Sequence, residues 1–159
     1  MNHVIGISEM KVSNKPGDAL VTYSLGSCVG VTLYDPIAGV GALLHSMLPL
    51  SKIDRRKAEA RPFMFVDTGV TQMLQTVFDL GAQRSRLIVK VAGCASLLDD
   101  KKLFKIGERN YTVLRKILWK NNILITAEDV GGTISRTMHL YMADGRTTIK
   151  SGGNEKVLA

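Results

Sequence analysis

The segment that decides the fold runs from residue 19 to residue 48 and reads ALVTYSLGSCVGVTLYDPIAGVGALLHSML. Three runs of β-branched, aromatic and aliphatic residues within it predict strands at 19–25, 29–34 and 40–48. The residues between the second and third runs, 35–39, have the composition of a tight turn. The segment therefore predicts a β-hairpin over 29–48, preceded by a strand that breaks off at Gly26-Ser27-Cys28.

The rest of the sequence alternates between strands and two helices. The spacing of apolar residues predicts helices at 66–80 and 110–119, while the polar segment 51–61 is expected to be a mobile loop. Further strands are predicted at 2–12, 86–92, 123–127, 133–142 and 147–150. Because hairpins predominate, the sequence predicts an α+β fold with mixed or antiparallel sheets. We expect a single domain over 1–153, followed by a flexible tail at 154–159.

The composition narrows the classes of function. With a formal charge of +7 and a pI of about 9.6, this chain of 159 residues suits an anionic partner, such as nucleic acid or an acidic protein. Its few aromatic residues do not interleave with the basic ones, which disfavours nucleic acid. The apolar stretch 40–50 is too short to span a bilayer and no signal peptide is visible. The sequence therefore predicts a cytoplasmic protein with no membrane insertion.

The chain has two cysteines, Cys28 and Cys94, which are too few for a disulfide framework. Neither has the cysteine and histidine spacing of a zinc site, and a reducing compartment leaves both thiols available for chemistry. Cys28 lies between Gly26 and Gly30 at a strand break, where a substrate can approach closely. Backbone N–H groups there, at Gly26 and Ser27, can face a developing oxyanion.

A thiol nucleophile needs a base, and His45 is the histidine nearest to Cys28 in the sequence. In an antiparallel hairpin, facing residue numbers have a constant sum. If Asp35 opposes Val40, Gly30 faces His45, and Cys28 and His45 become diagonal neighbours on one face of the sheet. An even sum would place them on opposite faces. The sequence leaves this register open.

The imidazole also needs a group that orients it. Thr22 points to the same side as Cys28 if strand alternation persists, so its hydroxyl can hold the ring, and Asp18 is the alternative. A cysteine or histidine in an apolar strand is, however, more often a packed residue than a catalytic one. Residue types alone therefore leave both interpretations of Cys28 and His45 open.

Short motifs in a fixed order and spacing point to a family. They are Thr22-x-x-Leu25-Gly26-Ser27-Cys28-Val29, Asp35-Pro36, His45-x-Met47-Leu48-Pro49, Lys90-Val91-Ala92-Gly93, Ile106-Gly107-x-Arg109-Asn110 and Glu128-Asp129-x-Gly131-Gly132-x-x-x-Arg136. Each motif alone is weak, but together they are specific. From about Val4 to Gly153 the chain resembles the CheD family, the chemoreceptor glutamine deamidases.

The resemblance implies a site, a fold and partners. The family's nucleophile, base and third residue correspond to Cys28, His45 and Thr22. Its members convert receptor glutamines to glutamates as protein-glutamine glutaminases, some also hydrolyse receptor methyl esters, and a CheC-type phosphatase commonly binds them. The family fold packs two β-sheets with helices on one outer side, in α/β/β layers. Such a cysteine–histidine pair requires no metal and no cofactor.

Cys94 is a departure from the family pattern, because it stands where the family often has glycine. No histidine is near it in the sequence, so we do not expect it to be the nucleophile.

Other functions also fit the sequence. A binding module with an idle site would dock to the phosphatase, with Leu103 and Phe104 as the expected contact. A cysteine peptidase would cleave the backbone, and a transglutaminase would incorporate an amine. A nucleic-acid binder would show strongly salt-dependent retention on DNA.

Overall fold

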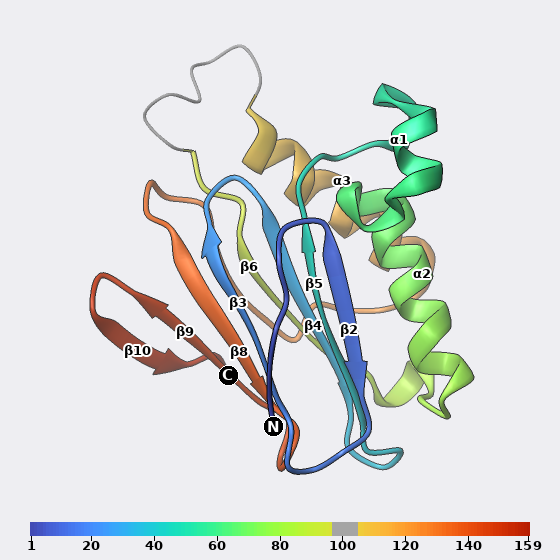
Figure 1. Ribbon diagram of the computed structural model, residues 1–159, viewed down its shortest axis with the longest axis vertical. Coiled ribbons are helices and arrows are strands. Elements are labelled where there is room, and N and C mark those ends of the chain that lie inside the picture. Colours follow the sequence, from blue (N-terminus) through green and yellow to red (C-terminus); the bar gives the residue numbers. More distant parts are fainter. Residues whose placement is uncertain (97–104) are drawn as a thin grey trace.

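The computed structural model describes residues 1–96 and 105–159, whose strands form two five-stranded sheets packed face to face (Figure 1). Sheet A has the order β1 (Asn2–Val4), β3 (Ala19–Leu25), β8 (Arg136–Tyr141), β9 (Arg146–Ser151) and β10 (Asn154–Val157). Sheet B has the order β2 (Glu9–Ser13), β5 (Val40–Ser46), β4 (Val29–Asp35), β6 (Ile88–Gly93) and β7 (Ala127–Val130). The β1–β3 and β6–β7 pairs are parallel, and all other paired strands of the two sheets are antiparallel. Both sheets are therefore mixed.

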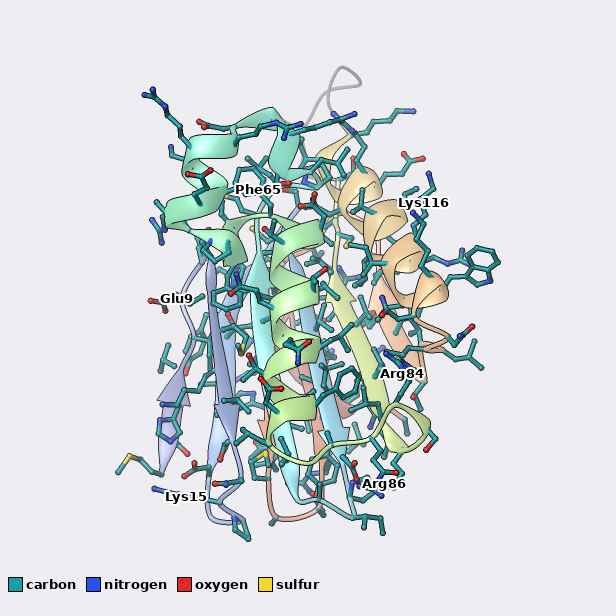
Figure 2. All side chains as sticks on the ribbon, turned by 90° about the vertical axis from the view of Figure 1, so that its right-hand side faces the viewer. Glu9, Lys15, Phe65, Arg84, Arg86 and Lys116 are labelled. Atoms are coloured by element: carbon teal, nitrogen blue, oxygen red, sulfur yellow. The ribbon has the colours of Figure 1, made fainter. Side chains whose placement is uncertain are left out.

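The helices α2 (Val66–Asp79) and α3 (Ile106–Lys120) cover the outer face of sheet B. The short helix α1 (Arg55–Ala60) lies at one end of this layer, next to 3-10 turns at Ser51–Ile53 and Pro62–Met64, and a further 3-10 turn is found at Arg84–Arg86. Seen from the helical side, α2 runs over the middle of the sheet with α3 beside it (Figure 2). The layers are therefore helices, sheet B and sheet A. This order confirms the predicted α+β fold with its two main helices on one outer face.

Two apolar cores separate the three layers. The core between the helices and sheet B includes Val29, Val31, Leu33, Val40, Ala42 and Leu44. The core between the two sheets includes Leu20, Leu25, Tyr34, Leu43, Met138, Leu140 and Ile149. Because strand residues alternate between faces, the apolar side chains of β4 and β5 divide between the two cores. A side chain at Gly30 would collide with Leu25 and Met138 of sheet A, so glycine lets the sheets approach there.

A buried carboxylate fixes the turn between β4 and β5. Asp35 accepts hydrogen bonds from the N–H groups of Ile37 and Ala38 within the turn, and from the N–H of Gln83. The Arg86 guanidinium also donates to it at 3.0 Å. Burial acts to raise the pKa of Asp35, but these donors outweigh it and lower the pKa to about 2. Asp35 therefore stays charged and holds the turn from which the hairpin register is counted.

Several predicted boundaries differ from the structure. Segment 51–61, expected to be a mobile loop, contains α1, which Asp54 caps by accepting from the Lys57 N–H. The flexible tail expected at 154–159 is wrong, because 154–157 form β10 and Leu158 is buried in the inter-sheet core. Segment 2–12 divides into β1 and β2, which belong to different sheets. The helix predicted at 110–119 begins four residues earlier, at Ile106, and the strand predicted at 123–127 is displaced to β7.

Candidate active site

The turn that carries Cys28 crosses from one sheet to the other. Gly26-Ser27-Cys28 connects β3 in sheet A to β4 in sheet B. The Cys94 N–H donates to the Cys28 carbonyl, and the Ala95 N–H donates to the Gly26 carbonyl, both at 2.9 Å. Gly93 has a φ of 97°, and a Cβ there would collide with the Cys28 carbonyl oxygen. The end of β6 can therefore support the Cys28 turn only with glycine at this position.

Of the two hairpin registers that the sequence left open, the structure has the one in which Asp35 pairs with Val40 and Gly30 with His45. Cys28 lies two residues before Gly30 and packs against the core between the sheets. Leu43, two residues before His45 on β5, belongs to the same core. The side chains of Cys28 and His45 therefore lie on the same face of sheet B, toward sheet A.

Thr22 contacts the imidazole from the opposite sheet. Its Oγ1 lies 2.6 Å from His45 Nδ1 and donates to the Ile5 carbonyl at 2.7 Å. Thr22 and His45 are both fully buried. This route differs from the expected one, because the β3–β8 pairing is irregular between Thr22 and Leu25 and β3 belongs to sheet A. Thr22 reaches the ring from the opposite sheet. The alternation of residues along a single strand therefore does not explain this contact.

The hydrogen bonds of Thr22 determine which nitrogen of His45 carries the proton. A hydroxyl has one proton, and Thr22 donates it to Ile5, so Oγ1 accepts from His45 Nδ1–H. The lone pair of the neutral ring is then on Nε2. Nε2 is buried and, among the described residues, has no hydrogen-bond partner, the Cys28 thiol included. Burial lowers the pKa of His45 to about 4, so the ring is neutral at pH 7.

Cys28 is partly exposed, unlike its two neighbours in the site. Burial raises the pKa of its thiol, while its own backbone N–H lowers it. Met47, which follows His45 on the same strand end, is 39% exposed beside this turn. At neutral pH the pair therefore rests as a thiol and a neutral imidazole, not as a thiolate–imidazolium pair.

Cys94 has a different environment. Its side chain is 5% exposed and packs in the core on the helical side of sheet B, away from the inter-sheet core that Cys28 contacts. Burial raises the pKa of the Cys94 thiol to about 12. These properties favour Cys28 over Cys94 as the reactive thiol.

Other residues named from the sequence do not join this site. Asp18 accepts from the Ser13 hydroxyl at 2.7 Å and lies 3.2 Å from His3 Nε2, so its carboxylate is engaged near the N-terminus. Leu103 and Phe104 lie outside the described residues. The predicted phosphatase contact at those two positions stays a prediction.

Sequence reasoning missed two partners of the site. The Ile5 carbonyl is a backbone group, which no residue pattern marks. Asn110 of α3 is buried, and its Nδ2 donates to the carbonyls of Ser27 and Met47 at 3.0 and 3.1 Å. The available signal was a polar residue in line with Leu114 and Leu118, where helical spacing favours an apolar one.

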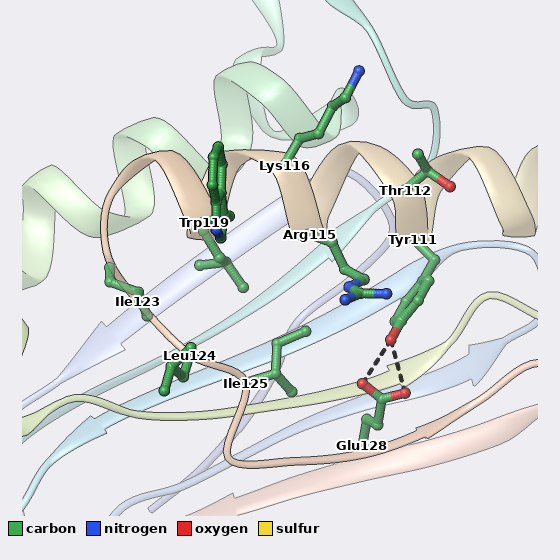
Figure 3. Close-up of a pocket in the computed structure, with 10 residues that line it drawn as sticks. Tyr111, Thr112, Arg115, Lys116, Trp119, Ile123, Leu124, Ile125 and Glu128 are labelled. Atoms are coloured by element: carbon green, nitrogen blue, oxygen red, sulfur yellow. Dashed lines mark hydrogen bonds between the residues drawn. The ribbon is translucent and has the colours of Figure 1, made fainter.

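A groove of about 700 Å³ lies between α3 and the segment that leads to β7 (Figure 3). Trp119 and Leu124 line it and are largely exposed, and the Tyr111 hydroxyl donates to the Glu128 carboxylate at 2.7 Å. No cysteine or histidine lines this groove. It therefore offers no nucleophile of the kind that the inter-sheet site contains.

Two further features concern metals and membranes. Across 1–96 and 105–159, no three or more histidine, cysteine, aspartate or glutamate side chains are grouped so that they could hold a metal ion. No helix in the part of the chain that the structure describes has the length and apolar character needed to cross a membrane.

Two packed mixed sheets, with a thiol and an imidazole on one inner face, define an α+β protein whose candidate site lies between its sheets. Comparison with known families then identifies the family. The model of the CheD family, described as CheD chemotactic sensory transduction, matches residues 47–151. This chain belongs to the CheD family, as its motifs predicted.

Relatives match over nearly the whole chain. The "Probable chemoreceptor glutamine deamidase CheD 1" of Syntrophus aciditrophicus is 49% identical over 150 residues, covering 94% of each chain. The "Probable chemoreceptor glutamine deamidase CheD" of Solibacter usitatus is 46% identical, covering 98% of this chain and 92% of the relative. The protein with the same description from Pyrococcus horikoshii is 38% identical, covering 97% and 94%.

Proposed function

We propose that this protein is a chemoreceptor glutamine deamidase in which Cys28 is the nucleophile, His45 the base and Thr22 the residue that orients the base. Membership of the CheD family supports the reaction class. The relatives described as chemoreceptor glutamine deamidases support the substrate, a glutamine side chain of a receptor in the cytoplasm. No metal and no cofactor takes part in the proposed chemistry.

The observation that carries the proposal is the proton arrangement at His45. Thr22 gives its proton to the Ile5 carbonyl and accepts the one on Nδ1, which leaves Nε2 as the basic nitrogen. Nε2 is a buried acceptor without a partner among the described residues. An unpaired polar atom is costly when it is buried. We therefore infer that Nε2 gains a partner during the reaction.

The proposed reaction has two stages. His45 Nε2 removes the Cys28 thiol proton as the sulfur attacks the side-chain carbonyl carbon of glutamine. The resulting imidazolium gives its proton to the amide nitrogen, and the carbon–nitrogen bond breaks. Ammonia departs, and a thioester between Cys28 and the substrate side chain remains. Water, deprotonated by His45, then attacks the thioester and releases glutamate with the thiol restored. The N–H groups of the Cys28 turn, from Gly26 and Ser27 onward, are the proposed oxyanion donors.

Because burial disfavours the charged forms of both Cys28 and His45, the thiol needs a base to remove its proton at each turnover. Burial lowers the pKa of His45 and raises that of Cys28, so both changes disfavour a standing ion pair. The thiolate therefore forms only as the proton moves to His45 during attack. This predicts an activity that rises with pH from acidic to neutral conditions.

Mass spectrometry of a chemoreceptor cytoplasmic fragment tests the function. We expect the purified protein to give selected glutamines the small mass gain that marks an amide becoming an acid, with release of ammonia. Backbone cleavage would instead identify a peptidase, and amine incorporation a transglutaminase. An unmodified fragment after incubation with folded protein would contradict the proposed function.

Two finer features accompany the proposal. The same thioester chemistry suits receptor methyl esters, so a methylated fragment should release methanol if the site accepts esters. A CheC-type phosphatase is the proposed protein partner. Leu103→Ala with Phe104→Ala should weaken its binding, measured by calorimetry, and an unchanged affinity would remove those two residues from the contact.

A further inference from the structure

Asn110 links the Cys28 turn to the strand that carries His45. It lies on the first turns of α3, and its Nδ2 donates to the Ser27 carbonyl at 3.0 Å and to the Met47 carbonyl at 3.1 Å. Ser27 directly precedes Cys28, and Met47 lies two residues after His45. One side-chain amide therefore bridges the backbone next to the nucleophile and the backbone next to the base.

The position of Asn110 disfavours a polar residue on packing grounds alone. Asn110 is fully buried and lies on the same buried face of α3 as Leu114 and Leu118. Its Oδ1 has no hydrogen-bond partner in the described part of the chain. An unpaired amide oxygen is costly when buried, and a leucine at this position would avoid that cost. The gain that offsets this cost is found in the two hydrogen bonds from Nδ2.

Gly107 explains how α3 comes close enough for this contact. A Cβ at Gly107 would collide with the carbonyl groups of Cys94 and Ala95, so the first turn of α3 lies directly on that backbone. The same segment donates to the carbonyls of Cys28 and Gly26. The glycine therefore lets α3 approach, and Asn110, three residues later, reaches the turn.

The bond to Ser27 acts on the peptide unit that contains the Cys28 N–H. In a planar trans peptide the C=O and N–H point in opposite directions, so fixing the Ser27 carbonyl toward α3 directs the Cys28 N–H away from it. Among the described residues, the Cys28 N–H points only to the sulfur of its own side chain and donates to no other acceptor. It is therefore free to face negative charge that develops on the sulfur or on the substrate oxygen.

We propose that Asn110 is a positioning residue that fixes the Ser27–Cys28 peptide and sets the separation between the Cys28 turn and the His45 strand. This inference rests on the proposed function, since it assigns Asn110 a part in that reaction. Asn110 acts through the backbone of the site, because its Nδ2 donates to two backbone carbonyls and not to the Cys28 sulfur or the His45 ring.

The test compares Asn110→Leu and Asn110→Ser with a matched control, Asn121→Ala. Asn121 lies at the other end of α3, and its Nδ2 donates to the Ile117 carbonyl at 2.8 Å, away from the site. Three quantities are measured on protein shown to be folded by circular dichroism. They are kcat and KM on a receptor fragment, and the pH dependence of Cys28 alkylation by iodoacetamide.

We expect both Asn110 variants to lower kcat about tenfold to a hundredfold, the effect of a small misplacement of reacting groups, with KM nearly unchanged. The midpoint of Cys28 alkylation should move to higher pH, because the N–H that stabilises the thiolate is no longer held. Asn121→Ala should leave all three quantities unchanged. The leucine in Asn110→Leu fills the volume of the asparagine but donates no hydrogen bond. The serine in Asn110→Ser keeps a donor group, but its side chain is too short to reach both carbonyls. Because the two variants change the site differently, a folding defect in one of them does not decide the outcome.

The outcomes separate this inference from the proposed function. If Cys28→Ala abolishes ammonia release while the Asn110 variants match Asn121→Ala in kcat and in alkylation, the role of Asn110 is overturned and the function stands. If the wild type releases no ammonia, the function fails, and the alkylation midpoint alone then decides whether Asn110 positions the Cys28 peptide.

Discussion

Thr22 is a neutral residue in a position that a carboxylate often occupies beside a catalytic histidine. It can accept from His45 Nδ1–H only because the Ile5 carbonyl takes its own proton. A buried carboxylate would stabilise the imidazolium, whereas a hydroxyl orients the ring without adding charge. This difference agrees with the pKa of His45, which burial lowers to about 4 with no opposing carboxylate.

Substitution of Thr22 tests this orienting role. Thr22→Val keeps the shape but leaves His45 Nδ1–H and the Ile5 carbonyl unpaired, which destabilises the fold by about 1–3 kcal/mol. Because the ring is then no longer oriented, we expect kcat to fall about tenfold to a hundredfold. Thr22→Ser retains the hydroxyl and should keep most of the activity. Steady-state kinetics on a receptor fragment measures both. Equal activity of the two variants would remove the hydroxyl from the mechanism.

Burial of neutral His45 also predicts a pH-dependent stability. The pKa is about 4 in the folded protein and 6.5 as the ordinary value, so between these pH values the unfolded chain binds more protons than the folded one. Stability therefore rises with pH across this window, by up to about 3 kcal/mol. Denaturant unfolding at a series of pH values measures this, with His45→Gln as the control. Parallel curves for the wild type and His45→Gln would show that His45 is not buried in its neutral form.

The sequence located the hairpin of the site but left its register open. Turn composition at 35–39 placed the turn, and the structure pairs Asp35 with Val40, which is the register that puts Cys28 and His45 on one face. The contact from Thr22 could not be derived in this way, because it depends on how one sheet packs on the other. Asn110 was missed for the same reason, since its partners lie 83 and 63 residues away along the chain.

The β4–β5 hairpin depends on the Asp35 carboxylate. Asp35→Asn removes the charge that pairs with Arg86 and should destabilise the fold by about 2–3 kcal/mol. The pKa of Asp35 is about 2 against an ordinary 3.8, so the wild type loses this contribution as pH falls from about 4 toward 2. Urea unfolding at neutral pH provides the measurement.

An exposed carboxylate serves as the control for Asp35. Asp79→Asn changes an exposed residue at the end of α2 and should alter stability by less than about 0.5 kcal/mol. A cost for Asp35→Asn no larger than that of Asp79→Asn would contradict the role of Asp35 in the turn.

Short elements were the least predictable from the sequence. Segment 51–61 is polar, and packing against the 3-10 turns at Ser51–Ile53 and Pro62–Met64, together with a cap from Asp54, makes part of it helical as α1. The strand β10 has four exposed residues and no alternating pattern, so its sequence resembles a tail. Tertiary contacts, and not local pattern, therefore decide the structure of both segments.

The end of the chain contributes to the packing of the two sheets. Leu158 is 6% exposed and belongs to the inter-sheet core, so Leu158→Ala should cost about 2 kcal/mol. Removal of 154–159 should cost more, because β10 is lost with it. Lys156→Ala removes a side chain that is 63% exposed and pairs with Asp129, and should cost less than about 1 kcal/mol. Thermal unfolding of the three variants measures this order, and equal stability of Leu158→Ala and the wild type would contradict it.

The arrangement of layers explains why the site lies where it does. Cys28 lies in the turn between the two sheets. His45 comes from sheet B, Thr22 from sheet A and Asn110 from the helical layer, so all three layers contribute to the site. Motif order was enough to identify the family, and the resemblance to that family implied the α/β/β layers. Motif order and resemblance were not enough to predict which layer supplies each contact.

The two cysteines of this chain allow the most direct test of Cys28 and His45 as a reacting pair. Ammonia release from a receptor fragment is measured for Cys28→Ala, His45→Ala and Cys94→Ala. We predict that the first two fall to the background rate, and that Cys94→Ala stays within the same order of magnitude as the wild type. Persistent ammonia release by folded Cys28→Ala, or loss of activity in Cys94→Ala alone, would contradict the assignment of the nucleophile.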